Sequence, residues 1–133
     1  MRYVVDTNIL FSGIYDLDSS AGDLLFLAIE GKVVLLAPDH VMEELRRILR
    51  DKLHFTTDET EEIISALPVE WIEMEIYADE MERARSLVSD GDDAPILACA
   101  LALGVDLITG DRGLLSAAVR EIRIRRLRDA VQE

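Results

Sequence analysis

The chain is poor in the residues that disulfide bonds and zinc sites require. Its 133 residues contain one cysteine, Cys99, and two histidines, His40 and His54. A lone cysteine cannot form an internal disulfide bond, and these isolated residues lack the spacing of a zinc-binding cluster. Cys99 lies in an apolar stretch, so we expect it to be a small core residue. This cysteine usage favours a reducing compartment, and a cytoplasmic location is therefore expected.

Long apolar runs are also absent. The longest, from Ile96 to Leu103, is far shorter than the roughly 20 residues that a membrane-spanning helix needs. The first residues lack a basic leader followed by an apolar core, so neither a membrane segment nor a signal peptide is expected. Apolar residues make up 50% of the chain and charged residues 31%, which is typical of a globular protein. At this length, we expect residues 1–133 to form a single domain.

Positive charge is scarce and unevenly placed. The net charge is −13, and the only lysines are Lys32 and Lys52. A general nucleic-acid-binding surface is therefore not expected, because contacts with phosphate need lysine and arginine. Arginines nevertheless cluster near the carboxyl end, at Arg120, Arg123, Arg125, Arg126 and Arg128. Two alternatives fit this cluster: a strand whose arginines pair with the acidic residues between 58 and 82, or an edge that contacts phosphate or a protein partner.

Apolar runs and helical patterns alternate along the chain. Strands are expected at residues 2–6, 33–37, 69–74, 106–109 and 122–127. Helices are expected at residues 20–29, 38–49, 57–67, 78–88, 93–104 and 114–119. A loop is expected after the first strand, with Ser12, Gly13, Asp16 and Asp18 in it. Strands separated by helices predict an α/β fold with a mainly parallel sheet.

Two acidic residues come at or just after the ends of predicted strands. Asp6 ends the run Tyr3-Val4-Val5, and Asp111 follows the strand at 106–109. A carboxylate at the end of a buried strand is costly unless something pairs with it. The carboxyl ends of strands are also where ligands bind in open α/β sheets. Two acids placed alike on two strands therefore predict a shared site, and a divalent metal ion is its expected occupant.

Two further acids lie on predicted helices. Asp93 begins one helix, and Glu44 lies within an earlier one. Each of these acids also has a simpler interpretation. For Asp93 and its neighbour Asp92 it is a helix cap. For Glu44, with Glu43 beside it, it is an exposed position, and for Asp111 it is a turn.

As a set, the four acids predict a metal site. The amino-terminal halves of the two helices should lie at the same edge of the sheet as the ends of the two strands. Carboxylates gathered this closely resist joint ionisation, and a divalent cation removes that conflict. Oxygen ligands alone favour Mg²⁺ or Mn²⁺. The sequence has neither a Walker A loop nor a GxGxxG motif that would indicate a nucleotide site instead.

Four segments resemble the motif blocks of the PIN-domain family, in the order of that family. They are residues 4–10 (VVDTNIL), 38–45 (PDHVMEEL), 92–98 (DDAPILA) and 109–112 (TGDR). The resemblance covers nearly the whole chain and is strongest with the small single-domain VapC-like toxins. It implies a three-layer α/β/α sandwich with a mainly parallel central sheet of about five strands. The activity that it implies is that of a metal-dependent ribonuclease using Mg²⁺ or Mn²⁺.

The resemblance also assigns roles to individual residues. By motif match, the catalytic and metal-binding acids are Asp6, Glu44, Asp93 and Asp111. Residues implied to support the site are Asn8 and Thr109, with Asp92 as an alternative third acid. The implied partners are an RNA substrate, a small antitoxin protein and a second copy of the chain. Separately, Arg112 is a candidate contact for substrate phosphate, because it follows Asp111 directly; a surface ion pair is the alternative.

Other functions fit parts of the same pattern. One is a non-catalytic module of this fold that acts by binding a protein partner. Another is a nuclease with similar acids that acts on DNA. A phosphoryl-accepting, receiver-like domain also gathers acids at strand ends, but such domains need a lysine on the last strand. That alternative is disfavoured, because the last predicted strand here is rich in arginine and lacks lysine.

Overall fold

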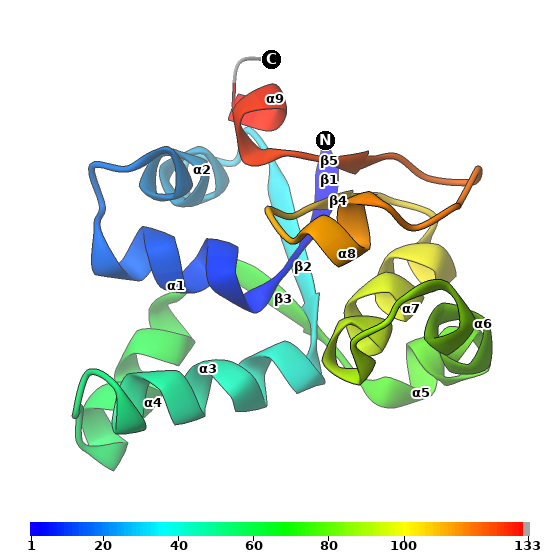
Figure 1. Cartoon of the computed structure of the whole chain (residues 1–133). Coiled ribbons are helices and arrows are strands. Elements are labelled where there is room, and N and C mark those ends of the chain that lie inside the picture. The colour runs from blue at the N-terminus through cyan, green and yellow to red at the C-terminus, as the bar shows by residue number, and fades with distance from the viewer. Residues whose placement is uncertain (132–133) are drawn as a thin grey trace.

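In the computed structural model, which describes residues 1–131, five strands form one central sheet (Figure 1). The strands are β1 (Arg2–Val5), β2 (Val34–Pro38), β3 (Val69–Ile72), β4 (Asp106–Ile108) and β5 (Ile124–Arg125). Their order across the sheet is β3-β2-β1-β4-β5, and every neighbouring pair is parallel. The expected α/β class and the five-stranded sheet are confirmed.

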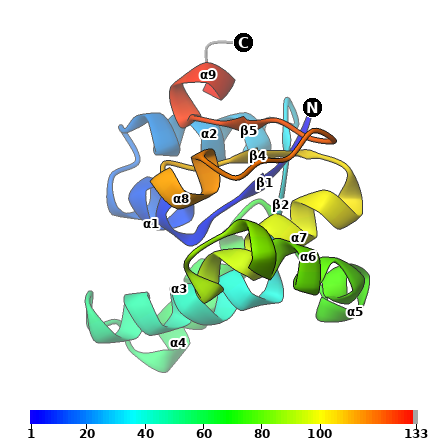
Figure 2. The same ribbon diagram turned by 45° about the vertical axis from the view of Figure 1, so that its right-hand side comes forward.

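Helices cover both faces of the sheet. They are α1 (Thr7–Tyr15), α2 (Ser20–Ile29), α3 (Asp39–Asp51), α4 (Thr57–Ala66), α5 (Met74–Tyr77), η1 (Ala78–Glu80), α6 (Met81–Leu87), η2 (Gly91–Asp93), α7 (Ala94–Leu103), α8 (Arg112–Leu115) and α9 (Leu127–Val131). Figures 1 and 2 show α1–α4 on one face and α5–α7 on the other, which confirms the three-layer α/β/α arrangement. The layers follow from right-handed crossovers, because the chain steps one way across the sheet from β1 to β3 and the other way from β3 to β5.

The central strands are apolar because helices cover them on both faces. Val4, Leu36 and Leu107, one each from β1, β2 and β4, are fully buried. Helix α7 packs against these three strands and is buried along its first seven residues, from Ala94 to Ala100. Cys99 lies among them as a free core cysteine, as expected. Within the described chain, no helix has both the length and the apolar character needed to cross a membrane.

The loop expected after the first strand is wrong for Ser12 and Gly13, because α1 begins at Thr7, directly after β1, and runs to Tyr15. Asp16 and Asp18 do lie in a loop, between α1 and α2. Asp6 starts this helix: its Oδ1 accepts a hydrogen bond from the backbone N–H of Ile9 at 3.0 Å. Gly13, which favoured a loop in the sequence, lies inside α1 where that helix packs against α2. A Cβ atom there would lie 2.7 Å from Leu25 Cδ1, so glycine permits the close approach of the two helices.

The third and last strands are shorter than expected. β3 ends at Ile72 rather than at residue 74, because α5 begins at Met74. The strand expected at 122–127 is reduced to Ile124–Arg125, and Leu127 instead begins α9. β5 is an edge strand that pairs only with the three-residue β4, so few ladder hydrogen bonds are available to extend it.

Helix α8 begins earlier than expected. It covers Arg112–Leu115 rather than residues 114–119. The reason is Asp111, whose Oδ2 accepts a hydrogen bond from the backbone N–H of Leu114 at 2.9 Å. This cap fixes the start of the helix immediately after the acid.

Candidate active site

The two strand-end acids lie where the strand order changes direction. β1 and β4 are neighbours, but the chain leaves them toward opposite edges of the sheet. The register pairs Val5 with Ile108, so the residues that follow, Asp6 and Thr109, are adjacent. In open α/β sheets, such a switch point forms a crevice at the carboxyl ends of the strands. Asp6 therefore lies at the edge of the sheet where this architecture binds ligands.

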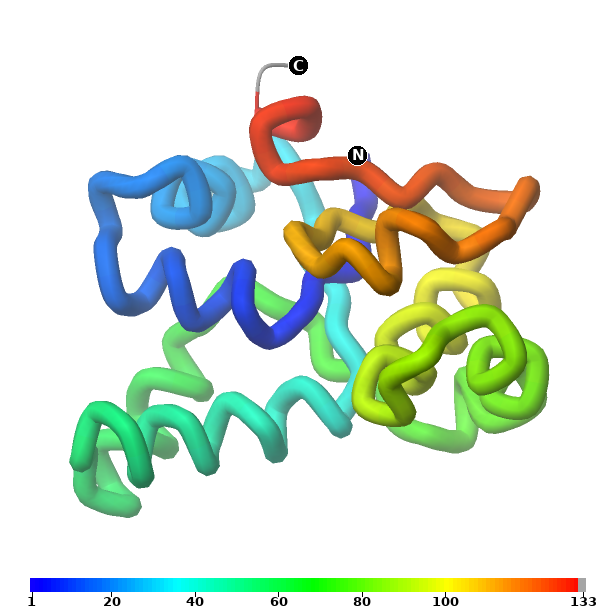
Figure 3. Tube along the Cα trace, in the orientation of Figure 1, coloured from blue at the N-terminus to red at the C-terminus, as the bar shows by residue number. Residues whose placement is uncertain are grey.

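A cavity of about 160 Å³ occupies this crevice. Its walls come from the starts of α1 and α7, from α3, and from the segment before α8. Figure 3 traces the course of the chain through these segments. The lining residues are Asp6, Thr7, Asn8, Glu44, Ile48, Asp90, Asp92, Asp93, Ile96 and Asp111. The structure thus brings together all four predicted acids, with Asn8 and Asp92. Arg112 lines a neighbouring cleft instead, and Thr109 lines that cleft while contacting Asp6.

Asp6 is held from two sides and is only 4% exposed. Its Oδ1 accepts the hydrogen bond from Ile9, and its Oδ2 accepts one from the hydroxyl of Thr109. Burial raises the pKa of the Asp6 carboxyl, and these hydrogen bonds offset that rise only in part. A cation beside this buried group would therefore favour its charged form.

Thr109 connects Asp6 to Asp111. Its buried hydroxyl donates to Asp6 and accepts a hydrogen bond from the backbone N–H of Asp111 at 3.0 Å. Asp111 then caps α8 through the bond to Leu114. Each strand-end acid therefore caps the helix that follows it and also lines the cavity, so the cap and the site are not competing roles.

Asp93 lies beside Asp111. A Cβ atom on Gly113 would lie 3.0 Å from Asp111 Oδ2 and 3.6 Å from Asp93 Oδ2, so this glycine leaves room for both carboxyl groups. Burial, and then repulsion from Asp111 and Asp90, raises the pKa of Asp93 to about 7. The Asp93 side chain makes no capping hydrogen bond with α7, so the simple helix-cap role does not apply to it. Carboxyl groups that oppose each other's ionisation are the arrangement that a cation relieves.

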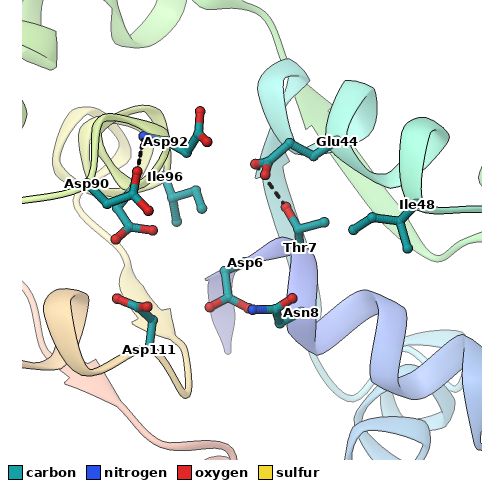
Figure 4. A pocket seen from close by; sticks show the side chains of 10 residues that line it. Asp6, Thr7, Asn8, Glu44, Ile48, Asp90, Asp92, Ile96 and Asp111 are labelled. Atoms are coloured by element: carbon teal, nitrogen blue, oxygen red, sulfur yellow. Dashed lines mark hydrogen bonds between the residues drawn. The ribbon is translucent and has the colours of Figure 1, made fainter. Parts of the chain in front are cut away.

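Glu44 reaches the cavity from α3, across from η2 (Figure 4). Its Oε1 accepts a hydrogen bond from Thr7 Oγ1 at 3.2 Å, and His40 Nε2 lies 3.1 Å from the same oxygen. Burial raises the pKa of Glu44, whereas His40 acts to lower it. His40 Nε2 also lies 3.5 Å from Asp92 Oδ1, so the imidazole stands between the two sides of the cavity.

The protein's own arginines and lysines do not neutralise the four acids. Among residues 1–131, no arginine or lysine forms an ion pair with Asp6, Glu44, Asp93 or Asp111. Glu43, the competitor of Glu44 in the sequence, instead binds Arg46, with 2.6 Å between Oε1 and Nη1. It does not line the cavity. The cavity thus collects negative charge, which His40 and Arg47 offset only at Glu44, whose pKa they act to lower.

The carboxylate oxygens that line the cavity suit a hydrated divalent ion. In the described part of the chain, no three His, Cys, Asp or Glu side chains are placed to enclose a metal ion by themselves. Mg²⁺ does not need such an enclosure, because it usually keeps several waters and binds one or two carboxylates. A cavity of about 160 Å³ has room for several water molecules, each of which takes about 30 Å³ in the liquid. Asp93 and Asp111 are the adjacent carboxylates that suit this mode of binding.

Comparison with known proteins assigns the chain to a family. The family model of the PIN domain matches residues 4–132. This chain belongs to the PIN-domain family. Among solved structures, this PIN domain resembles a chain of VapBC2 from Rickettsia felis, in a crystal structure of that complex bound to a DNA fragment from its promoter. The TM-score is 0.68 at 18% identity, over 95% of this chain and 98% of that one. None of the curated proteins compared with the chain matches it.

Three polar residues in or beside the cavity of this PIN domain were not predicted as site residues: Thr7 and Asp90, which line it, and His40, which contacts Glu44 and Asp92. His40 precedes Glu44 by four positions on α3, a spacing that places both on one helix face and could have indicated their contact. Asp90 begins an acid-rich turn, in which its Oδ1 accepts a hydrogen bond from the backbone N–H of Asp92 at 3.0 Å. Thr7 follows Asp6 directly, but nothing in the sequence shows that its hydroxyl reaches α3.

Proposed function

We propose that this PIN domain is a metal-dependent ribonuclease that hydrolyses phosphodiester bonds in RNA. One observation carries the proposal. Four carboxyl groups from separate segments line a single cavity at the switch point of the sheet, without an arginine or lysine paired to them in residues 1–131. Such a cavity repels phosphate unless a cation is present, so its chemistry with nucleic acid requires a metal ion.

In this proposal Asp6, Asp93 and Asp111 hold Mg²⁺ or Mn²⁺, directly or through water. The metal supplies a water of lowered pKa and stabilises negative charge on the phosphate oxygens. Glu44 completes the set of oxygen ligands or orients the attacking water. Its carboxylate is positioned for this by the hydrogen bond from Thr7, which fixes it against α1.

Two polar residues support the acids. The hydroxyl of Thr109 donates a hydrogen bond to Asp6 Oδ2 and so fixes the orientation of that carboxylate. The remaining lone pairs of the carboxylate oxygens are left for other partners. Asn8 lines the cavity two residues beyond Asp6 and offers an amide to a metal-bound water or to a phosphate oxygen. Both act by positioning groups in the cavity.

We further infer that the protein acts in the cytoplasm as the toxin of a toxin–antitoxin pair, held inactive by a small antitoxin protein. Support comes from the family and from the shared fold with a chain of the VapBC2 complex. Expression of the chain in a host cell tests its role as a toxin: the wild-type protein should arrest growth, and the Asp6→Asn variant should not.

The nuclease activity is tested by incubating the protein with matched single strands of RNA and DNA, in Mg²⁺, in Mn²⁺ and in EDTA. RNA cleavage that needs metal and is lost in Asp6→Asn is the expected result. Cleavage of DNA in place of RNA would assign the site to a DNA nuclease. No cleavage, together with no effect of metal on the melting temperature, would overturn the proposal in favour of a non-catalytic, partner-binding module.

A further inference from the structure

A second cleft, which we call the arginine cleft, adjoins the acidic cavity. Its volume is about 410 Å³. The residues that line it are Ser20, Thr109, Gly110, Arg112, Arg126, Leu127 and Arg128. Three of them are arginines, and none is acidic. In a chain with a net charge of −13, such a concentration of positive charge next to the acidic cavity is unexpected from composition.

The segment from Thr109 to Arg112 separates the two spaces. The hydroxyl of Thr109 contacts Asp6 and the N–H of Asp111 in the acidic site, while Thr109 and Gly110 also line the arginine cleft. Arg112 follows Asp111 directly and belongs to the cleft. A molecule lying in the arginine cleft therefore lies next to the carboxylates.

The arginines of the cleft are free to bind a ligand. The side chains of Arg112, Arg126 and Arg128 are exposed and make no hydrogen bond or ion pair with any residue in the described chain. Other arginines are engaged: Arg83 Nη1 lies 2.6 Å from Glu121 Oε2, and Arg125 Nη1 lies 4.0 Å from Asp106 Oδ2. Within residues 1–131, Arg120, Arg123, Arg126 and Arg128 form no ion pair with the acidic residues between 58 and 82, so that alternative does not hold for these four arginines.

We propose that the arginine cleft binds the sugar-phosphate backbone of the RNA strand beside the phosphate that is cleaved. This inference rests on the proposed function, because it takes the acidic cavity as the place of cleavage. An RNA strand carries a phosphate at every nucleotide, so a strand with one phosphate at the acids must place its neighbours nearby. The carboxylates would repel those neighbours, whereas guanidinium groups bind phosphate through paired N–H donors.

The alternative occupant is an acidic segment of a protein partner, since guanidinium groups also bind carboxylates. The position of the cleft favours the nucleic acid. The cleft and the acidic cavity share the Thr109–Arg112 wall, so a strand can follow one continuous path across both. Ser20 adds the first turn of α2, whose amino-terminal partial positive charge also favours phosphate.

Binding can be measured without cleavage in the Asp6→Asn background. A fluorescently labelled single-stranded RNA is titrated at several salt concentrations, and its anisotropy gives the dissociation constant. Adding Arg126→Gln and Arg128→Gln should weaken binding and reduce the slope of log K against log salt by about 1.4, because each phosphate contact on a single strand contributes about 0.7. The wild-type protein in EDTA, which should also leave the RNA uncleaved, is titrated in the same way as a second measurement of binding.

The matched control is the pair Arg2→Gln and Arg85→Gln, which removes the same charge elsewhere. Arg2 lies at the amino end of β1, opposite the site, and Arg85 lies on α6. Neither lines the arginine cleft. The control should bind RNA like its parent. If the cleft variant binds RNA as tightly as the control does, with the same salt slope, the inference is overturned.

Two further outcomes separate the inference from the proposed function. If wild-type protein cleaves no RNA but the cleft variant still loses RNA binding, the nuclease proposal fails while the cleft stands as a phosphate site. If the cleft variant loses binding of a polyglutamate peptide but keeps its affinity for RNA, the cleft belongs to a protein partner and the inference fails. In cleavage assays, the cleft variant should show a raised KM with kcat nearly unchanged.

Discussion

The hydroxyl of Thr109 donates a hydrogen bond to the carboxylate of Asp6, although the two residues lie 103 positions apart in the chain. The bond joins the ends of β1 and β4 across the switch point of the sheet. Both partners are buried, with Asp6 only 4% exposed and Thr109 fully covered. Any substitution that removes this donor leaves a buried carboxylate oxygen without its partner.

Thr109→Val should therefore destabilise the fold and weaken the site. An unsatisfied buried acceptor costs about 1–3 kcal/mol, and the loss of a supporting hydrogen bond lowers metal affinity about 10–100-fold. Urea denaturation measures the first effect, and titration with Mn²⁺ measures the second. Thr60→Val is the matched control: Thr60 is equally buried, but its hydroxyl bonds to the Thr56 carbonyl at 2.8 Å in α4. Equal Mn²⁺ affinity in the two variants would show that Thr109 does not support the site.

The stability of the metal-free protein should depend on the protonation of Asp93. Its pKa rises from 3.8 to about 7 in the folded chain. Between those values the folded state keeps a proton that the unfolded state has lost, so raising the pH favours unfolding. Asp6 and Glu44 shift in the same direction. Melting temperatures in EDTA should therefore fall between about pH 4 and 7, through the contribution of these groups.

Asp93→Asn isolates this contribution, because the amide does not titrate. The variant should gain stability relative to wild type as the pH rises through the same window. A constant difference in melting temperature between the two proteins from pH 4 to 8 would contradict the raised pKa of Asp93.

Divalent metal should stabilise the protein through the acids that line the cavity. At a concentration 100 times its dissociation constant, a ligand that binds only the folded state contributes about 2.7 kcal/mol. The neighbours Glu43 and Glu44 provide a matched test, because only Glu44 lines the cavity. Glu44→Gln should reduce the rise in melting temperature caused by Mn²⁺, and Glu43→Gln should leave it intact. Equal shifts in both variants would remove Glu44 from the metal site.

The sequence predicted most of the architecture because its signals are local. The apolar run ending at Asp6 indicates a buried strand, and Gly104 ends α7 in the left-handed conformation that glycine favours. The sequence-based predictions are wrong where tertiary contacts determine the local structure. Gly13 lies inside α1, where glycine permits the close approach of Leu25 on α2, and no local pattern reveals this packing. Likewise, β5 is short because β4 offers it few partners.

The membership of the site was predictable in a similar way. The alternation of strands and helices brings the four acids to one edge of the sheet, and all four line the cavity. Other roles depend on side-chain contacts between distant segments. The bond between Thr7 and Glu44 spans 37 positions, and the imidazole of His40 bridges α3 and η2. Spacing along the chain could have indicated the contact of His40 with Glu44, but not these contacts between distant segments.

Gly113→Ala should impair the site without unfolding the protein. A Cβ atom there would lie 3.0 Å from Asp111 Oδ2, so this carboxylate oxygen, which lies beside Asp93, must shift by a few tenths of an ångström to make room for the methyl group. Alanine is otherwise the better helix former, and the substitution in α8 should cost the fold little. We expect lower Mn²⁺ affinity and slower cleavage of RNA at a nearly unchanged melting temperature in EDTA. Gly91→Ala is the control, because a Cβ atom there meets nothing within 4 Å, although Gly91 also neighbours the acids. If both variants bound Mn²⁺ like the wild type, this displacement of the Asp111 carboxylate would not affect metal binding, and the prediction would be wrong.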